Sequence, residues 1–177
     1  MRIVILAGGA GRRIGGGKPL RMLGGMTLLD RALAMARSWS DEVLIADGTT
    51  DAPEIEGPLG GVATALARGE DILTIPCDMP FLPPDLPERL SGQDAAAVLA
   101  ESGGRLHPVC ALWRASAADG LPAYVASGRR SLHGFAEAVG YATVSWSTEP
   151  VDPFFNINDE DDLKRAEALL KKEIRSS

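Results

Sequence analysis

The chain has 177 residues, of which 24 are acidic and 18 basic, and its formal net charge is −6. This charge disfavours a general nucleic-acid or membrane-surface binder, because such proteins usually present a basic face. No apolar run approaches the ~18 residues of a membrane-spanning helix, and residues 2–6 predict a strand rather than an export signal, so we expect a cytoplasmic protein with no nucleic-acid or membrane partner.

The first half of the chain predicts alternating strands and helices. Short apolar runs at residues 2–6, 42–46 and 71–75 are bounded by polar or turn residues and are typical of buried parallel strands. Thr27 is a candidate N-cap for the helix between the first two runs, and Pro58 lies where the next helix should begin. This β-α-β-α-β order requires crossover connections, and it therefore predicts a parallel sheet.

The second half predicts a less regular arrangement. Apolar runs at residues 94–100 and 107–113 flank a polar turn at 101–105, which predicts two antiparallel strands. We expect the later elements to be helices near 115–127 and 131–139, a strand over 141–146, and a last helix that starts at Asn158. The length and this element order predict a single α/β domain over residues 1–177.

The loop that follows the first strand, residues 7–19, is the most informative segment. It contains six glycines together with Arg12, Arg13 and Lys18. Glycine lets a ligand approach the backbone closely, successive backbone N–H groups can form an anion-binding concavity, and the cations add positive charge. The loop therefore predicts a polyphosphate site in a nucleotide-binding enzyme, in preference to a flexible surface turn.

This loop matches neither of the two common phosphate-binding motifs. A P-loop requires Ser or Thr after its lysine, whereas Pro19 follows Lys18. A dinucleotide-binding fingerprint requires a helix directly after the strand, and the glycine run and Pro19 oppose one.

Acidic residues follow the other two predicted parallel strands. Asp47 comes directly after the second strand and Asp78 shortly after the third. Ligands of open parallel sheets bind beyond the carboxyl ends of the strands, so these carboxylates should face the cationic loop. Mg²⁺ typically takes one or two carboxylates together with phosphates and water, and Asp78 is the best metal candidate; its alternative is a turn or N-cap aspartate. Cys77 and Cys110 have no metal-ligand spacing and favour two reduced, buried thiols.

The first loop resembles that of the nucleotidyltransferase superfamily, which reads Leu-Ala-Gly-Gly-x-x-x-Arg and then Gly and Lys. Four further segments resemble the molybdenum cofactor guanylyltransferase family (MobA type) and occur in its order: residues 57–61, residues 76–82, His107-Pro-Val, and Phe155-Asn-Ile-Asn followed by Asp162-Leu163. Together they span nearly the whole chain. The resemblance implies a Rossmann-like three-layer sandwich with a mostly parallel sheet and an antiparallel component in the second half. It also implies a nucleotide-binding half over about 1–90 and an acceptor-binding half over about 91–177.

The resemblance implies transfer of GMP from Mg·GTP to the terminal phosphate of molybdopterin or the molybdenum cofactor, with release of pyrophosphate. It makes Asp78 the Mg²⁺ ligand and, with Lys18, a catalytic residue. The nucleotide site would consist of Leu6, Ala7, Gly8, Gly9, Arg12, Arg13, Lys18, Asp47 and Asp51. We expect one of the two arginines to contact the triphosphate and the other to be solvated. The acceptor would bind near His107, Asn156 and Asn158, and other cofactor-biosynthesis proteins are possible partners.

The chain departs from the family pattern at two positions, and other interpretations remain. Asp47 occupies a position where the family usually has asparagine, and Gly17 replaces a common acidic residue. His107 also fits a polar strand end, and Asn158 fits the N-cap of the last helix, which the sequence by itself favours. The alternatives in function are a nucleotidyltransferase that uses CTP or a sugar phosphate, and a non-catalytic nucleotide-binding module.

Overall fold

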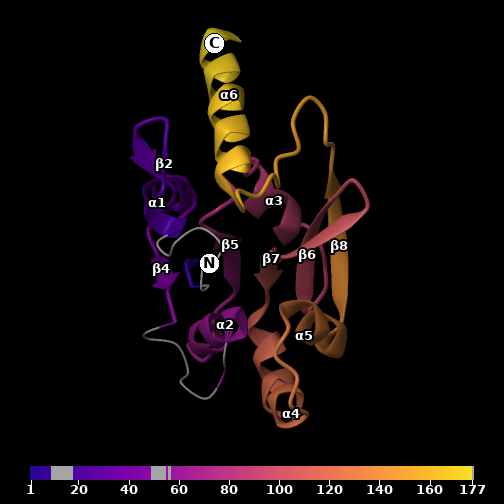
Figure 1. Cartoon of the computed structure of the whole chain (residues 1–177). Helices are drawn as coiled ribbons and strands as arrows, with labels where there is room; N and C mark the ends of the chain where they lie inside the picture. The colour runs from indigo at the N-terminus through magenta and orange to yellow at the C-terminus, as the bar shows by residue number, and fades with distance from the viewer. Residues whose placement is uncertain (9–17, 49–54, 56, 177) are drawn as a thin grey trace.

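The computed structural model of the chain describes residues 1–8, 18–48, 55 and 57–176, apart from the side chains of residues 18 and 172–176. Its centre is one six-stranded mixed sheet (Figure 1). The strand order is β4 (Val43–Ala46), β1 (Arg2–Leu6), β5 (Ile72–Pro76), β7 (Arg105–Trp113), β6 (Ala97–Ser102) and β8 (Tyr141–Trp146). β1 pairs in parallel with β4 and β5, β6 pairs in parallel with β8, and β7 runs antiparallel to β5 and β6. The predicted mixture of parallel and antiparallel pairing is confirmed.

Helices cover both faces of this sheet and complete the three predicted layers. α1 (Leu28–Trp39) and α3 (Leu86–Ser91) pack on one face, and α2 (Pro58–Leu66), α4 (Leu121–Ala126) and α5 (Leu132–Val139) pack on the other. Successive side chains of a strand point to opposite faces, so Ile3 and Ile5 of β1 lie on the α1 side and Val4 and Leu6 on the α2 side. All four are buried, which explains why β1 is apolar from Ile3 to Leu6.

The predicted starts of α1 and α2 are confirmed. The Thr27 hydroxyl accepts a hydrogen bond from Asp30 N at 3.0 Å, as an N-cap does, and Pro58 is the first residue of α2. The sequence did not predict the short 3₁₀ helix η2 (Lys18–Leu20) or the small hairpin of β2 (Met22–Leu23) and β3 (Met26–Thr27) that precede α1.

The second half differs from the prediction in its details. β6 and β7 extend into the predicted polar turn, because Gly103 and Gly104 make a two-residue connection with φ of +55° and +77°. The helix expected near 115–127 is a 3₁₀ segment, η3 (Ala115–Gly120), followed by α4. The last helix, α6 (Glu160–Ser176), begins two residues later than predicted.

α6 extends from one end of the molecule (Figure 1). Its Ala166 is buried in a small third core with Leu23, Leu28 and Ile157, which anchors the start of the helix beside the β2–β3 hairpin. None of the helices in the described part of the chain is long and apolar enough to cross a membrane.

The pairing of β5 with β7 joins the two halves of the sheet, and a buried threonine lies at this junction. Thr74 of β5 faces Ala111 of β7, and its hydroxyl donates to Ala111 O at 3.1 Å. Trp113 Nε1 donates to the same hydroxyl at 3.2 Å. Thr74 and Trp113 are fully buried, so neither polar group can exchange its partner for water.

Thr74→Val should therefore destabilise the fold by about 1–3 kcal/mol, because it leaves the buried Trp113 N–H without a partner. Urea unfolding would measure the loss. In a Trp113→Phe background, which lacks the N–H, the same substitution should cost at least about 0.5 kcal/mol less. Equal losses in the two backgrounds would contradict this account of the junction.

Candidate active site

The carboxyl ends of the three parallel strands of the first half meet at one edge of the sheet. Leu6, the last residue of β1, pairs with Ala46 of β4 and with Pro76 of β5. Ala7 N and Gly8 N both donate to Ala46 O, at 2.9 and 3.1 Å. The loops that follow β1 and β4 therefore lie against each other, as predicted from the strand order.

Gly8 allows these two loops to make this contact. A Cβ atom at this position would lie 3.1 Å from the carbonyl carbon of Asp47 and 3.2 Å from its oxygen, closer than side-chain carbons usually approach a backbone. The structure thus brings Leu6, Ala7, Gly8 and Asp47 together. Gly9, Arg12, Arg13 and Asp51 lie outside the described residues, and of Lys18 only the backbone is described, so their predicted roles stay predictions.

Asp78 lies at the same edge, just beyond β5. Its side chain is half-buried, and its backbone carbonyl accepts a hydrogen bond from Ile157 N at 2.9 Å. This bond fastens the Asn156-Ile157-Asn158 segment to the end of β5. The two halves of the chain, separated by almost eighty residues here, therefore meet beside Asp78.

The two cysteines are free and buried, as predicted. Burial, together with the negative charge of Asp78, raises the pKa of the Cys110 thiol well above its usual value. A buried thiol that stays protonated is neither a nucleophile nor a metal ligand at neutral pH. Across the described ranges, no three or more His, Cys, Asp or Glu side chains form a metal-binding group. A single carboxylate such as Asp78 suits Mg²⁺, which completes its coordination with phosphates and water, but not a metal held entirely by protein.

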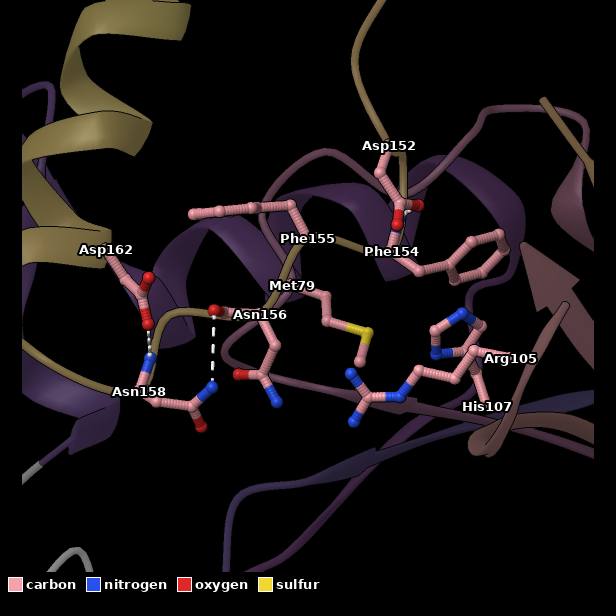
Figure 2. A pocket seen from close by; sticks show the side chains of 9 residues that line it. All are labelled: Met79, Arg105, His107, Asp152, Phe154, Phe155, Asn156, Asn158 and Asp162. Carbon is pink, nitrogen blue, oxygen red and sulfur yellow. Dashed lines mark hydrogen bonds between the residues drawn. The ribbon is translucent and has the colours of Figure 1, made fainter. Parts of the chain in front are cut away.

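A polar pocket lies next to Asp78 on the side of the second half of the chain. Figure 2 shows the side chains around it, which come from the loop after β5, from β7, from the segment before α6 and from α6 itself. They are Met79, Arg105, His107, Asp152, Phe154, Phe155, Asn156, Asn158 and Asp162. The structure thus places the three residues predicted for the acceptor side, His107, Asn156 and Asn158, around one pocket.

A bulge in β7 positions His107. Leu99 of β6 pairs with Ala111, but the next residue, Ala100, pairs with His107, so residues 108–110 are extra on β7. Pro108 has no backbone N–H and cannot take part in a regular ladder, which accounts for the irregularity at this point. Bulges bend a strand and re-aim its side chains. The His-Pro-Val segment is therefore the place where β7 leaves regular pairing and presents His107 to the pocket.

Hydrogen bonds and stacking hold the His107 ring. Its Nε2 lies 2.8 Å from Ser102 Oγ, and the Ser102 hydroxyl donates to Asp152 Oδ1 at 2.9 Å. Phe154 stacks on the ring, with centroids 4.7 Å apart and planes inclined by 14°. Burial lowers the pKa of His107, and the Arg105 charge lowers it further, against the opposite effect of Asp152 and Glu101. The imidazole is therefore neutral at neutral pH.

The expectation that Asn158 caps the last helix is wrong. Asp159 Oδ1 accepts hydrogen bonds from Asp161 N at 3.0 Å and Asp162 N at 2.9 Å, so Asp159 is the capping residue. Asn158 N instead donates to Asp162 Oδ2 at 3.0 Å, and its side-chain amide donates to Asn156 O at 3.5 Å. Asn158 lies at the pocket beside Asn156 (Figure 2).

Three polar residues of this region were not predicted from the sequence: Ser102, Arg105 and Asp152. For Arg105 a signal existed, because residues two apart on a strand point to the same face, and Arg105 precedes His107 by two. Ser102 and Asp152 are fifty residues apart in the sequence, and nothing in the local pattern of either residue indicates their contact.

Comparisons with known proteins agree on the relationships of this chain. Residues 3–140 match the family model described as a MobA-like NTP transferase domain. The chain is 40% identical to a molybdenum cofactor guanylyltransferase of Acidiphilium cryptum, over 95% of this chain and 94% of that protein. It is also similar to the solved structure of molybdopterin-guanine dinucleotide biosynthesis protein A from Archaeoglobus fulgidus. That match has a TM-score of 0.74 and 28% identity, and it covers 97% of this chain and 100% of the other. The 2-C-methyl-D-erythritol 4-phosphate cytidylyltransferase of Thermus thermophilus is similar in fold, with a TM-score of 0.66 and 21% identity, over 95% of this chain and 98% of that one.

Proposed function

The chain belongs to the MobA-like NTP transferase family, and we propose that it transfers GMP from Mg·GTP to the terminal phosphate of molybdopterin or the molybdenum cofactor, releasing pyrophosphate. Relatives that match over nearly their whole length are named molybdenum cofactor guanylyltransferases, at 36% and 40% identity. The cytidylyltransferase in the same fold class is more distant, and it supports the fold alone.

The hydrogen bond from Ile157 N to Asp78 O is the observation that carries this proposal. A transferase must bring the phosphate of its acceptor to the α-phosphate of its nucleotide. Here the loop edge of β1, β4 and β5 lies on one side of Asp78 and the polar pocket on the other. A nucleotide on the first side and an acceptor in the second would therefore meet beside this carboxylate.

We assign the nucleotide to the first side. Leu6, Ala7, Gly8 and Asp47 would contact the base and sugar, and the glycine-rich segment with Gly9, Arg12, Arg13 and Lys18 would bind the triphosphate. Asp51 would belong to the same nucleotide wall. Guanine has an N1–H and an N2 amino donor that adenine lacks, and backbone carbonyls of these loops suit such donors. A site built for those donors rejects an analogue that leaves its acceptors unpaired.

The proposed chemistry requires little of the protein beyond position and charge. The acceptor's terminal phosphate is already an anion, so a strong general base is not needed. Asp78 would hold Mg²⁺, and the bound ion would supply charge neutralisation at the triphosphate. Lys18 would contact the same phosphates and stabilise the charge that develops as the α-phosphoryl group is transferred. His107, Asn156 and Asn158 would orient the acceptor.

Incubation with molybdopterin, Mg²⁺ and each of the four nucleoside triphosphates tests the proposal directly. We expect mass spectrometry to detect the guanylylated pterin as the main product and pyrophosphate as its partner. A cytidylylated product would favour the cytidylyl alternative. A chain that binds GTP without forming any product would be a nucleotide-binding module.

Asp78→Asn should keep the fold and lose most of the transfer activity, because it keeps the shape of the side chain and weakens the metal ligand. Lys18→Ala should lower kcat by about 10²-fold. Steady-state rates at saturating GTP would measure both. Asp41→Asn, an exposed aspartate before β4 at the opposite edge of the sheet, is the matched control. Near-normal turnover by either site variant would contradict its assigned role.

Asn156→Ala should raise the KM for molybdopterin and leave the affinity for GTP nearly unchanged, because Asn156 lies in the acceptor pocket. Calorimetry would measure GTP binding, and steady-state kinetics would measure use of the acceptor. Gln93→Ala, which removes an exposed side-chain amide between α3 and β6, controls for the loss of a polar side chain. An equal loss of affinity for both ligands, or a loss for GTP alone, would contradict the assignment of Asn156 to the acceptor site.

A further inference from the structure

We propose that Ser102 and Asp152 are positioning residues that hold His107 in the Nε2–H tautomer, so that its Nδ1 accepts a hydrogen bond from an N–H group on the heterocycle of the acceptor. This inference rests on the proposed function for the identity of the ligand. It assigns roles to Ser102, a buried residue at the end of β6 that contacts His107, and to Asp152, which lines the pocket from the segment before α6.

Counting the hydrogens of the network gives the tautomer. Asp152 Oδ1 accepts from Phe154 N at 2.9 Å and from the Ser102 hydroxyl at 2.9 Å. A serine has one hydroxyl hydrogen, and here the carboxylate takes it. Ser102 Oγ can then only accept from His107 Nε2, which lies 2.8 Å away and must carry the hydrogen. A neutral imidazole with a proton on Nε2 has a lone pair on Nδ1.

The packing around the ring keeps this orientation. Phe154 stacks on His107, and Trp146 packs edge-on against Phe154 with centroids 5.4 Å apart. Both aromatic rings are buried, and Phe154 is the residue whose N–H bonds to Asp152. The same short segment therefore supplies the carboxylate of the network and the surface on which the imidazole lies.

Nδ1 of His107 faces the pocket beside the Arg105 side chain (Figure 2). Within the described residues, no protein group makes a hydrogen bond to this nitrogen. A neutral ring nitrogen that accepts and a guanidinium that donates thus line the same pocket. Such a pair is complementary to a ring edge that carries an N–H and an adjacent acceptor atom, as a pterin does.

Burial, more than the charges around the ring, keeps His107 in the accepting form. Arg105 comes from β7, Glu101 from β6, Asp152 from the segment before α6, and Asp162 from α6 at the far side of the pocket. Burial and Arg105 oppose protonation of the imidazole, and they outweigh the negative charges of Asp152 and Glu101, so the pKa of His107 is lowered. A protonated ring would donate at Nδ1 and would reject the same ligand edge.

The order of the three side chains excludes a hydrolytic triad. In a Ser-His-Asp triad the histidine lies between the serine and the carboxylate. Here the serine lies between the other two, and Ser102 is 2% exposed and donates its only hydroxyl hydrogen to Asp152. The arrangement therefore fixes a tautomer and does not activate a nucleophile.

The tautomer can be measured in the wild-type protein by ¹⁵N NMR of the histidine side chains. The chain has only two histidines, so a His133→Gln variant identifies the remaining histidine signals as those of His107. We expect the pattern of an Nε2–H tautomer at pH 7.5, and an upfield shift of the Nδ1 resonance when a pterin without a phosphate is added. An Nδ1–H tautomer, or an Nδ1 resonance that the pterin does not move, would overturn the inference.

Ser102→Ala tests the positioning role kinetically. The variant should show a changed tautomer pattern for His107 and a KM for molybdopterin raised about tenfold, with the KM for GTP within about twofold of wild type. Ser102→Thr, which keeps the hydroxyl, should recover most of the wild-type tautomer pattern and of the wild-type KM for molybdopterin. Ser145→Ala, which removes another serine hydroxyl that donates to a carboxylate, that of Glu101, is the control outside the pocket.

These measurements separate the two proposals. If wild type forms no guanylylated pterin, the proposed function fails, and the NMR of the protein with the pterin still decides the positioning role. If wild type forms the product but Ser102→Ala keeps both its tautomer and its KM for molybdopterin, the positioning role is wrong and the proposed function stands.

Discussion

The antiparallel pairing of β5 with β7 is the constraint on which the candidate site depends. Because β7 runs against β5, the amino end of β7 lies at the carboxyl end of β5, where Asp78 follows. A parallel β7 would carry His107 to the opposite edge of the sheet. Thr74 fixes this junction with a buried hydroxyl that bonds to one residue of β7 through the backbone and to another through the indole of Trp113. A polar group buried in this way favours one register over its alternatives, since a shifted strand would leave its partners unpaired.

The two walls of the site are built by different physical means. On the wall that we assign to the nucleotide, the described contacts are between backbones: Ala7 and Gly8 donate to Ala46, and Gly8 has no side chain to keep the loops apart. These N–H groups are used in the contact between the two loops, and they hold the loops together without the entropy cost of ordering long side chains. On the wall that we assign to the acceptor, the contacts are between side chains that are buried, stacked and hydrogen-bonded, as for His107. Such a wall suits a heterocycle, whose edge is read by individual donors and acceptors.

The segment from Asp152 to Asp162 connects these features. It supplies the carboxylate bound to Ser102, the ring stacked on His107, the amide of Asn156, the backbone donor to Asp78 and the cap of α6. Phe154 and Ile157 are buried and hold the segment to two different cores, while the polar residues between and beside them line the pocket. A short irregular segment can present this many groups because its side chains do not alternate between two faces as those of a strand do.

The sequence by itself determined the elements and the kinds of chemistry. The pattern of apolar residues and the positions of cap and turn residues predicted the strands, the starts of α1 and α2 and the antiparallel hairpin. These features depend on local preferences and on which faces are buried. The glycine loop and the placement of Asp47 and Asp78 predicted a phosphate site, because strand order places the ends of parallel strands together. The tertiary structure alone decided that Asp159 rather than Asn158 caps α6 and that Ser102, His107 and Asp152 form one network. Each of these depends on a choice between hydrogen-bond partners that are equally available along the chain. Only the packing of distant segments makes one of those partners closer than the others.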